Sequence, residues 1–336
     1  MNICFVSQNG HVGKVPRNFP NCRTEFAWQI ALNADHYNFQ DWLSTDKTYD
    51  LIIVILPKKL EIIDTNILLD SIKSRGKKVT TMQEGPAWYY QDYKYEHQVN
   101  YINFLSEMDF LLTHNKSDIP YFKGIFNKPT FNLQSLMIED TIKDVTRDNN
   151  GMPIIGGNFC SWYGGIDSYF VAQTFNKPIF IPSMGRKIDN EDQFPSLHHL
   201  PYMMWNEWIK ALANFNVGIH LMRTHAAGTF ALNCAYLGIP CIGYKGLDTQ
   251  QILHPELSVD IGDIEQAKKL ANKLKQDISF YNLCSEQSRE LYQIYYTEEK
   301  WLDNWKTIYE QIKNSNWYRW LWICRKSISC IFQRSL

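Results

Sequence analysis

The stretch VGIHLMRTHAAGTFALNCAYLGIPCIGY, residues 217–244, decides the fold class of this 336-residue chain. It begins with a short apolar run, passes through a loop into an apolar segment of helical length, and reaches a second apolar run after Gly-Ile-Pro. Two apolar runs joined by a helix are typical of neighbouring parallel strands and their crossover helix. The stretch therefore predicts one repeating unit of an α/β fold.

Similar units recur on both sides of this stretch, and the length of the chain suggests roughly two domains. In the first half we expect strands at 2–7, 50–56, 78–83 and 110–114 and helices at 23–33, 65–75 and 96–108. In the second half we expect strands at 153–159, 178–183, 217–222 and 240–244 and helices at 168–174, 204–214, 228–237 and 264–276. Alternation of this kind predicts two Rossmann-like domains that face a central cleft.

The polar segment 142–150 lacks strong periodicity and is the expected linker between the two domains. We therefore expect one Rossmann-like domain at 1–145 and a second at 151–305. A helical tail at 306–336 follows. Its last part, 316–336, mixes large apolar and basic side chains without an acidic one, so it predicts a helix on an anionic membrane surface. Packing of the tail on the first domain is the alternative.

Charge and cysteine content limit the function classes. The 34 basic and 35 acidic residues nearly cancel, so we expect no nucleic acid partner. The eight cysteines are scattered without a Cys-x-x-Cys pair, which favours a reducing compartment. The apolar run at 2–7 lacks a basic leader and is interpreted as a buried strand. These features predict a cytoplasmic protein, with peripheral attachment to the inner face of a membrane through its tail.

The loop that leads into the helix at 228–237 predicts an anion site. The first amides of a helix have no partner within it, and its dipole places partial positive charge there. Arg223 stands beside this loop at the end of a strand. A purely structural helix and strand is the alternative interpretation of the same segment.

Residues 150–305 resemble the donor-binding half of GT-B glycosyltransferases. The likeness rests on the Gly-led helix with Gly-x-Pro (Gly228, Cys234, Gly238 and Pro240) and on the ordered segments at 156–165, 180–187, 246–257, 258–274 and 292–305. Two glutamates of many retaining members are missing, since their places fall near His225 or Ala226 and at Asn233. The resemblance implies a nucleotide-sugar donor bound by Arg186, Lys187, Arg223, Thr224, Gly228, Thr229 and Asp248.

The first half offers candidates for catalysis and for the acceptor. An inverting transfer needs a base for the acceptor hydroxyl, and Glu84, at the end of a strand, is the first candidate, followed by Asp92 and His11. Gly10, in the loop after the first strand, and the aromatic residues Trp88 and Tyr89 are candidate acceptor contacts. Three adjacent aromatic residues, 88–90, cannot share one face, so at least one should belong to the core.

The resemblance implies a sugar transfer without a required metal or other cofactor. No Asp-x-Asp motif occurs, and the acidic residues at 189–192 are expected to be solvated. We therefore expect an enzyme, a glycosyltransferase that acts on a glycan or lipid-linked glycan in surface polysaccharide or lipopolysaccharide synthesis. A sugar-nucleotide epimerase or hydrolase on the same fold is one alternative. A noncatalytic adaptor at the membrane surface is the other.

Overall fold

The computed structural model describes residues 1–56, 64–83, 85, 87–148, 150–159, 163–182 and 191–314. Within these residues the chain forms two six-stranded sheets, with strand orders β2-β1-β3-β4-β5-β6 and β12-β11-β10-β7-β8-β9. Neighbouring strands run parallel in both sheets. The predicted α/β class with two parallel sheets is therefore confirmed.

The first sheet is built around a strand that is buried along nearly its whole length. Its strands are β1 (Ile3–Ser7), β2 (Asp35–Asn38), β3 (Tyr49–Leu56), β4 (Gly76–Gln83), β5 (Phe110–Thr113) and β6 (Thr130–Asn132). The helices of this half are α1 (Thr24–Ala31), α2 (Phe39–Leu43), α3 (Thr65–Arg75), α4 (Tyr95–Ser106) and α5 (Ile119–Phe126). In β3, the residues from Leu51 to Leu56 are all buried, as expected of a parallel strand covered on both faces.

The second sheet repeats this plan with shorter strands. They are β7 (Pro153–Ile155), β8 (Ile179–Ile181), β9 (Leu197–His199), β10 (Val217–His220), β11 (Cys241–Tyr244) and β12 (Ser258–Val259). The helices here are α6 (Gly165–Ala172), α7 (Trp205–Leu212), α8 (Thr229–Leu237), α9 (Asp248–Leu253), α10 (Ile264–Gln276) and α11 (Ile278–Tyr295). The stretch 217–244 forms β10, α8 and β11 as predicted.

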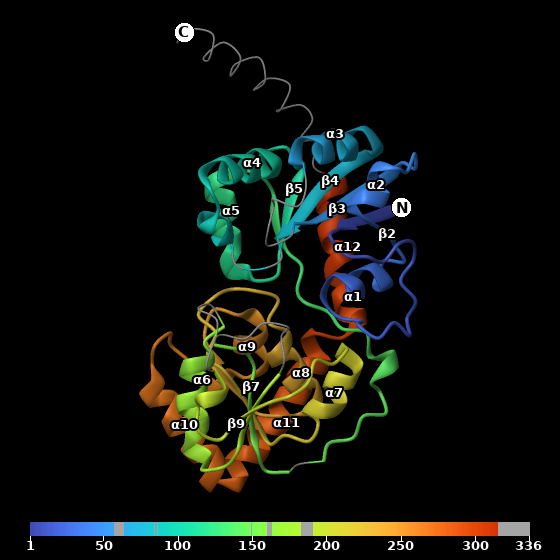
Figure 1. Ribbon diagram of the computed structural model, residues 1–336. Coiled ribbons are helices and arrows are strands. Elements are labelled where there is room, and N and C mark those ends of the chain that lie inside the picture. The colour runs from blue at the N-terminus through green and yellow to red at the C-terminus, as the bar shows by residue number, and fades with distance from the viewer. Residues whose placement is uncertain are drawn as a thin grey trace.

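The last described helix, α12 (Glu298–Asn314), returns to the first half, where Figure 1 shows it beside α1. The indole nitrogen of Trp301 donates a hydrogen bond to the carbonyl of Gln134 at 2.9 Å. The rings of Trp301 and Trp28 lie 5.8 Å apart, and both side chains are fully buried. The predicted boundary at residue 305 falls inside this helix, and the tail segment 316–336 lies outside the described residues.

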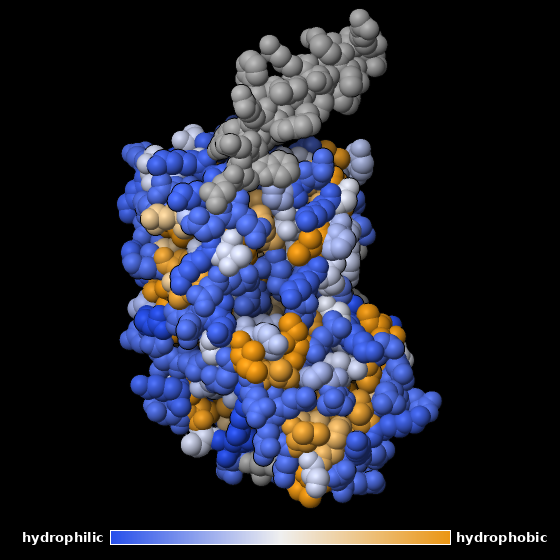
Figure 2. All heavy atoms as spheres, turned by 180° about the vertical axis from the view of Figure 1, so that it is seen from behind, coloured by the Kyte–Doolittle hydropathy of each residue, from blue (hydrophilic) through white to orange (hydrophobic). Residues whose placement is uncertain are grey.

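The described surface and helices bear on the predicted membrane attachment. Figure 2 shows one face as largely hydrophilic, with separate apolar patches. None of the helices in the described part of the chain combines the length and the apolar character that a bilayer-spanning helix requires. The five cysteines that lie in the described part of the chain, Cys4, Cys22, Cys234, Cys241 and Cys284, are buried and free.

Two expectations about side-chain burial had different outcomes. Tyr90 is buried and stacks on Tyr101 with ring centroids 4.6 Å apart, so it is the core member of the aromatic run at 88–90. The prediction that the acidic residues at 189–192 are solvated was wrong for Glu191, which is fully buried. Its carboxylate accepts hydrogen bonds from the Phe159 amide at 2.8 Å and from His199 at 3.0 Å, and these two bonds offset the cost of burying the charge.

Candidate functional site

The start of α8 combines a helix terminus with a backbone geometry that requires glycine. Gly228 caps the helix with φ of 66°, and a Cβ built on it would lie 2.0 Å from Oγ1 of Thr249. The predicted residues Thr224 and Thr229 flank it, the first buried and the second partly exposed. The amides of the first turn therefore face the end of the sheet from which the loop comes, as a phosphate site requires.

Arg223, the predicted cation of this site, is paired within the second half. Its guanidinium donates to Oδ2 of Asp167 at 2.9 and 3.1 Å, and the Tyr244 hydroxyl donates to the same oxygen at 3.0 Å. The hydrogen bond with Asp167 raises the pKa of Arg223. The Arg223 side chain remains 55% exposed. Its charge is therefore partly offset before any ligand binds.

The predicted donor ligand Asp248 joins the two halves of the molecule. Oδ2 of Asp248 accepts from the Lys116 amide at 2.9 Å, and the Asp248 amide donates to Oδ1 of Asn115 at 2.9 Å. Asn115 Nδ2 in turn donates to the carbonyl of Ala226 at 2.9 Å. Burial raises the pKa of Asp248. The residues after β5 are thereby attached to the loops after β10 and β11.

A second pair crosses the same interface, between residues that the sequence analysis did not select. Nδ1 of His225 lies 2.8 Å from Oδ1 of Asp118 and 3.1 Å from Oγ of Ser117. The hydrogen bond with Asp118 raises the pKa of His225. We call Asn115, Ser117, Asp118, His225 and Asp248 the interface cluster. The sequence THNKSD at 113–118 could have indicated this site, because five polar residues follow the end of a buried strand.

A small cavity lies beside the interface cluster, at the ends of β4 and β5. It is lined by Gln83, Gly85, Ala87, Leu112, Thr113, His114, Asn115, Asp118, Phe122 and Ala226. His114 is 7% exposed, its Nδ1 has no hydrogen-bond partner, and burial lowers its pKa to about 4. The cavity measures about 10 Å³, close to the roughly 10–15 Å³ that a single water requires. The cavity therefore has about the size of one water molecule.

A larger cavity of about 130 Å³ lies against the first turns of α8. It is lined by Arg23, Gly156, Pro182, Pro201, Tyr202, Met203, Trp205, Trp208, Thr229, Phe230 and Asn233. Asn233, which stands where the resembling sequences carry a glutamate, accepts a hydrogen bond from the Trp205 indole at 3.4 Å. Aromatic walls with a few polar groups are typical of small-molecule binding pockets in general. This cavity adjoins the predicted phosphate site through Thr229.

His220 lies under the glycines that follow β7. The residue is only 7% exposed, and neither ring nitrogen has a hydrogen-bond partner. A Cβ on Gly156 would lie 2.7 Å from the ring, and one on Gly157 would lie 3.3 Å from Nε2. Burial lowers the pKa of His220 to about 4, so the ring is neutral near pH 7. The two glycines are therefore needed for the loop to lie on this ring.

His11 and Gly10 occupy the loop after β1. The ring of His11 packs on Phe19 and Phe26, with centroids 5.5 and 6.4 Å apart. Its Nε2 is buried without a hydrogen-bond partner, and its carbonyl contacts Nδ1 of His36 at 2.5 Å. Gly10 is exposed, and no atom lies within 4 Å of a Cβ built on it. The catalytic and acceptor roles of the two residues remain predictions.

Several predicted residues cannot be placed. Glu84, Arg186 and Lys187 lie outside the described residues. Asp92 and Tyr89 belong to the short helix η2 (Tyr89–Asp92), but their side chains lie outside the described part of the structure. The neighbouring Trp88 is 36% exposed. No group of three or more metal-ligating side chains occurs within the described ranges. The predicted roles of these residues and the predicted independence from metal remain open to experiment.

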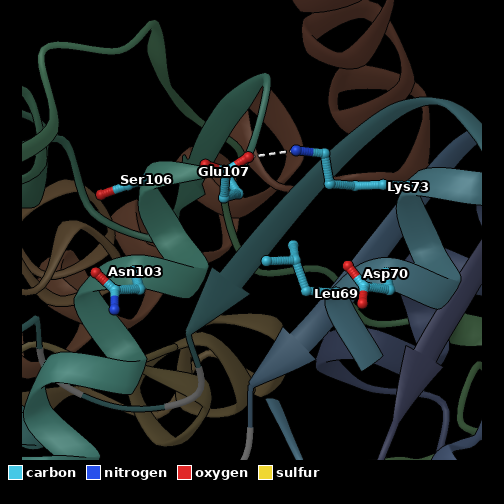
Figure 3. A pocket seen from close by; sticks show the side chains of 6 residues that line it. All are labelled: Leu69, Asp70, Lys73, Asn103, Ser106 and Glu107. Carbon is cyan, nitrogen blue, oxygen red and sulfur yellow. Dashed lines mark hydrogen bonds and ion pairs between the residues drawn. The ribbon is translucent and has the colours of Figure 1, made fainter. Parts of the chain in front are cut away.

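A further groove of the first half lies away from the interface cluster. Figure 3 shows it between α3 and α4, lined by Leu69, Asp70, Lys73, Asn103, Ser106 and Glu107. An ion pair between Lys73 and Glu107 crosses it, and each of these two side chains is 38% exposed. In Figure 1 both helices lie at the end of the first half that is remote from the second. The groove is therefore separate from the interface cluster.

No protein-family model matches the sequence, and no curated protein sequence is significantly similar to it. Solved structures do match the whole arrangement of two sheets. An alpha-glucosyltransferase in complex with UDP-glucose and DNA superposes with a TM-score of 0.65 at 14% identity, over 94% of this chain and 100% of that one. The chain has the GT-B fold.

Two further solved structures share this fold. Sucrose-phosphate synthase from Thermosynechococcus elongatus has a TM-score of 0.65 at 10% identity, over 94% of this chain and 100% of that one. The pneumococcal O-GlcNAc transferase GtfA, in complex with UDP and GlcNAc, has a TM-score of 0.57 at 12% identity, over 82% of this chain and 60% of that one. The predicted GT-B architecture is confirmed.

One expectation about partners needs correction. The balanced net charge led us to expect no nucleic acid partner, but the alpha-glucosyltransferase that shares this fold is solved in several complexes with DNA. The reason is physical, because net charge averages over the whole surface, whereas a nucleic acid contacts a local patch. Near neutrality therefore does not exclude nucleic acid.

Proposed function

We propose that the protein is a glycosyltransferase that uses a nucleoside diphosphate sugar. The observation that carries the proposal is the glycine-capped start of α8, which faces the opposite half across the interface cluster. In open parallel sheets, ligands bind at the carboxyl ends of the strands, and here the loops after β5, β10 and β11 meet. A donor bound at α8 would therefore present its sugar to the first half.

The larger cavity and the start of α8 support an assignment of the donor's parts. The nucleoside would occupy the 130 Å³ cavity beside Asn233, and the diphosphate would lie at Gly228, Thr229 and the Thr224 loop. Arg186, Lys187 and Arg223 are proposed to neutralise the diphosphate, and Asp248 to accept from a donor hydroxyl. UDP is the first nucleotide to test, because it is present in structures that share the fold.

Transfer is proposed to need no metal, with helix amides and cations stabilising the leaving diphosphate. Inversion with Glu84 as the base is the reaction to test first, with Asp92 and then His11 as the alternative bases. NMR of the product decides the stereochemistry, since an inverting enzyme yields the opposite anomeric configuration to that of the donor. An unchanged rate in the presence of a chelator supports the metal-independent part, and loss of activity refutes it.

The acceptor is proposed to be a glycan or lipid-linked glycan of surface polysaccharide or lipopolysaccharide synthesis, with Gly10, Trp88 and Tyr89 as its contacts. Attachment of a cytoplasmic enzyme to an anionic membrane through 316–336 would bring it to such an acceptor. Deletion of 316–336 should then release the protein from anionic liposomes. Unchanged binding to the liposomes contradicts that attachment.

The central test is nucleotide binding followed by product analysis. UDP should raise the melting temperature, because a ligand that binds only the folded state stabilises it. UDP-sugars should then be screened against glycan, lipid-linked and DNA acceptors for release of UDP and formation of a glycoside. Failure of uridine, guanosine, cytidine and adenosine diphosphates alike to shift the melting temperature removes the basis of the proposal.

A further inference from the structure

His225 is the histidine of the interface cluster, and its contacts define which ring nitrogen is available. Nδ1 lies 2.8 Å from a carboxylate oxygen of Asp118. Because a carboxylate accepts hydrogen bonds, Nδ1 carries the proton of that bond. Asp118 ends the short helix η3 (Lys116–Asp118) of the first half, whereas His225 lies in the loop between β10 and α8. The pair therefore forms only when the two halves are in contact.

The other ring nitrogen of His225 is open. Nε2 has no hydrogen-bond partner among the described residues, and the side chain is 30% exposed. It faces the turn after β11, where a Cβ on Gly246 would lie 2.7 Å from Nε2. Any side chain at residue 246 would fill the space beside Nε2, so the glycine is needed there. His225 itself lies three residues before the cap of α8. A ligand at the start of α8 has a nitrogen donor within the same loop.

The charged surroundings favour the protonated ring. Asp118 and Asp248 are the acidic groups that act on His225. Lys116 in turn acts on Asp248, and the buried His114 is acted on by Asp118. The hydrogen bond that His225 donates to Asp118 raises the pKa of His225, so the imidazolium persists to a higher pH than that of a free histidine. Arg223 shares its charge with Asp167, and His225 shares its charge with Asp118. On the side of Nε2, however, the His225 ring has no such partner among the described residues.

We propose that His225, oriented by Asp118 from the opposite half, donates its Nε2 hydrogen to the diphosphate of the bound donor. This assignment rests on the proposed function and adds a residue to it. When the bond between the anomeric carbon and the diphosphate oxygen breaks, the electron pair stays on that oxygen, and the Nε2 hydrogen bond stabilises its charge. The acceptor oxygen forms the new bond to the anomeric carbon and loses its proton to the base.

The assignment holds for inversion and for retention, because both reactions break the same bond. It also gives domain contact a chemical role. Separation of the halves removes Asp118 from the ring, which weakens the preference for the imidazolium and leaves the diphosphate without this donor. Stabilisation of the leaving group would therefore be assembled by closure, as in induced fit.

The test compares binding of UDP and of uridine, which lacks phosphate, from about pH 5.5 to 8.5, a range that spans the titration of histidine. His225→Gln should bind UDP about tenfold more weakly than the wild type at the acidic end, with the ratio approaching one at the alkaline end. The ratio for uridine should stay near one throughout. Because UDP titrates identically with both proteins, the ratio isolates the histidine.

Two further variants keep the result interpretable. Asp118→Asn should move the inflection of UDP binding to lower pH while binding at the acidic end is kept. His97→Gln, which alters a histidine beside Glu96 on α4 outside the interface, should leave the profile unchanged. If the wild type binds UDP and His225→Gln shows the same profile, this inference is refuted and the proposed function stands. If the wild type binds no diphosphate, the proposed function fails first.

Discussion

Gly228→Ala should destabilise the protein by two separable effects. A residue with a Cβ at a φ of 66° costs about 1–2 kcal/mol relative to glycine. The new Cβ would also lie 2.0 Å from Oγ1 of Thr249, and such overpacking costs about 1–3 kcal/mol. We therefore expect a loss of about 2–5 kcal/mol in the free energy of unfolding, measured in urea. UDP binding should weaken as well, because the first turn of α8 is displaced.

The structure offers a matched control and a rescue for this experiment. Gly262 has a φ of 90° and no atom within 4 Å of its Cβ position, so Gly262→Ala should show only the backbone cost of about 1–2 kcal/mol. Oγ1 of Thr249 is buried without a hydrogen-bond partner, and Thr249→Ala removes it. The double variant Gly228→Ala with Thr249→Ala should recover about 1–3 kcal/mol relative to additivity. Equal stability of the Gly228 and Gly262 variants, or additive effects in the double variant, would refute the reasoning.

Other predictions address the remaining parts of the structure. Trp301→Ala should lower the free energy of unfolding by about 3–5 kcal/mol in a urea titration, because it empties the contact between α12 and the first half; a loss below about 1 kcal/mol contradicts that packing. Asn233→Leu should weaken binding of both UDP and uridine in calorimetry, and unchanged affinities would place the nucleoside elsewhere. Acid should destabilise the fold between about pH 6.5 and 4, because burial lowers the pKa to about 4 in His36, His114, His220 and His254. Between these pH values the unfolded state binds more protons than the folded state, so the denaturant midpoint should decrease as the pH is lowered from about 6.5 to 4. Lowering the pH toward about 6.5 from above should not decrease the midpoint through these histidines.

The regular elements could be predicted because their signals are local. The alternation of apolar runs with helical segments located β1, β3, β4, β5, β10, β11 and α8 within a few residues. The short strand β2 was missed, because its sequence DHYN lacks the apolar run of a buried strand. Its place at the edge of the sheet beside β1 comes from pairing with that strand, which local propensity does not record.

The sequence by itself determined the parallel α/β architecture and the glycine-capped helix at 229–237, since period, turn residues and helix polarity act over a few neighbours. Only the tertiary structure decided which charges meet. Asp118 and His225 are 107 residues apart in sequence, and Lys116 and Asp248 are 132 residues apart. Each pair nevertheless forms a hydrogen bond across the interface. Tertiary packing likewise paired Arg223 with Asp167 and buried Glu191, because the partners of a charge come from other elements of the fold.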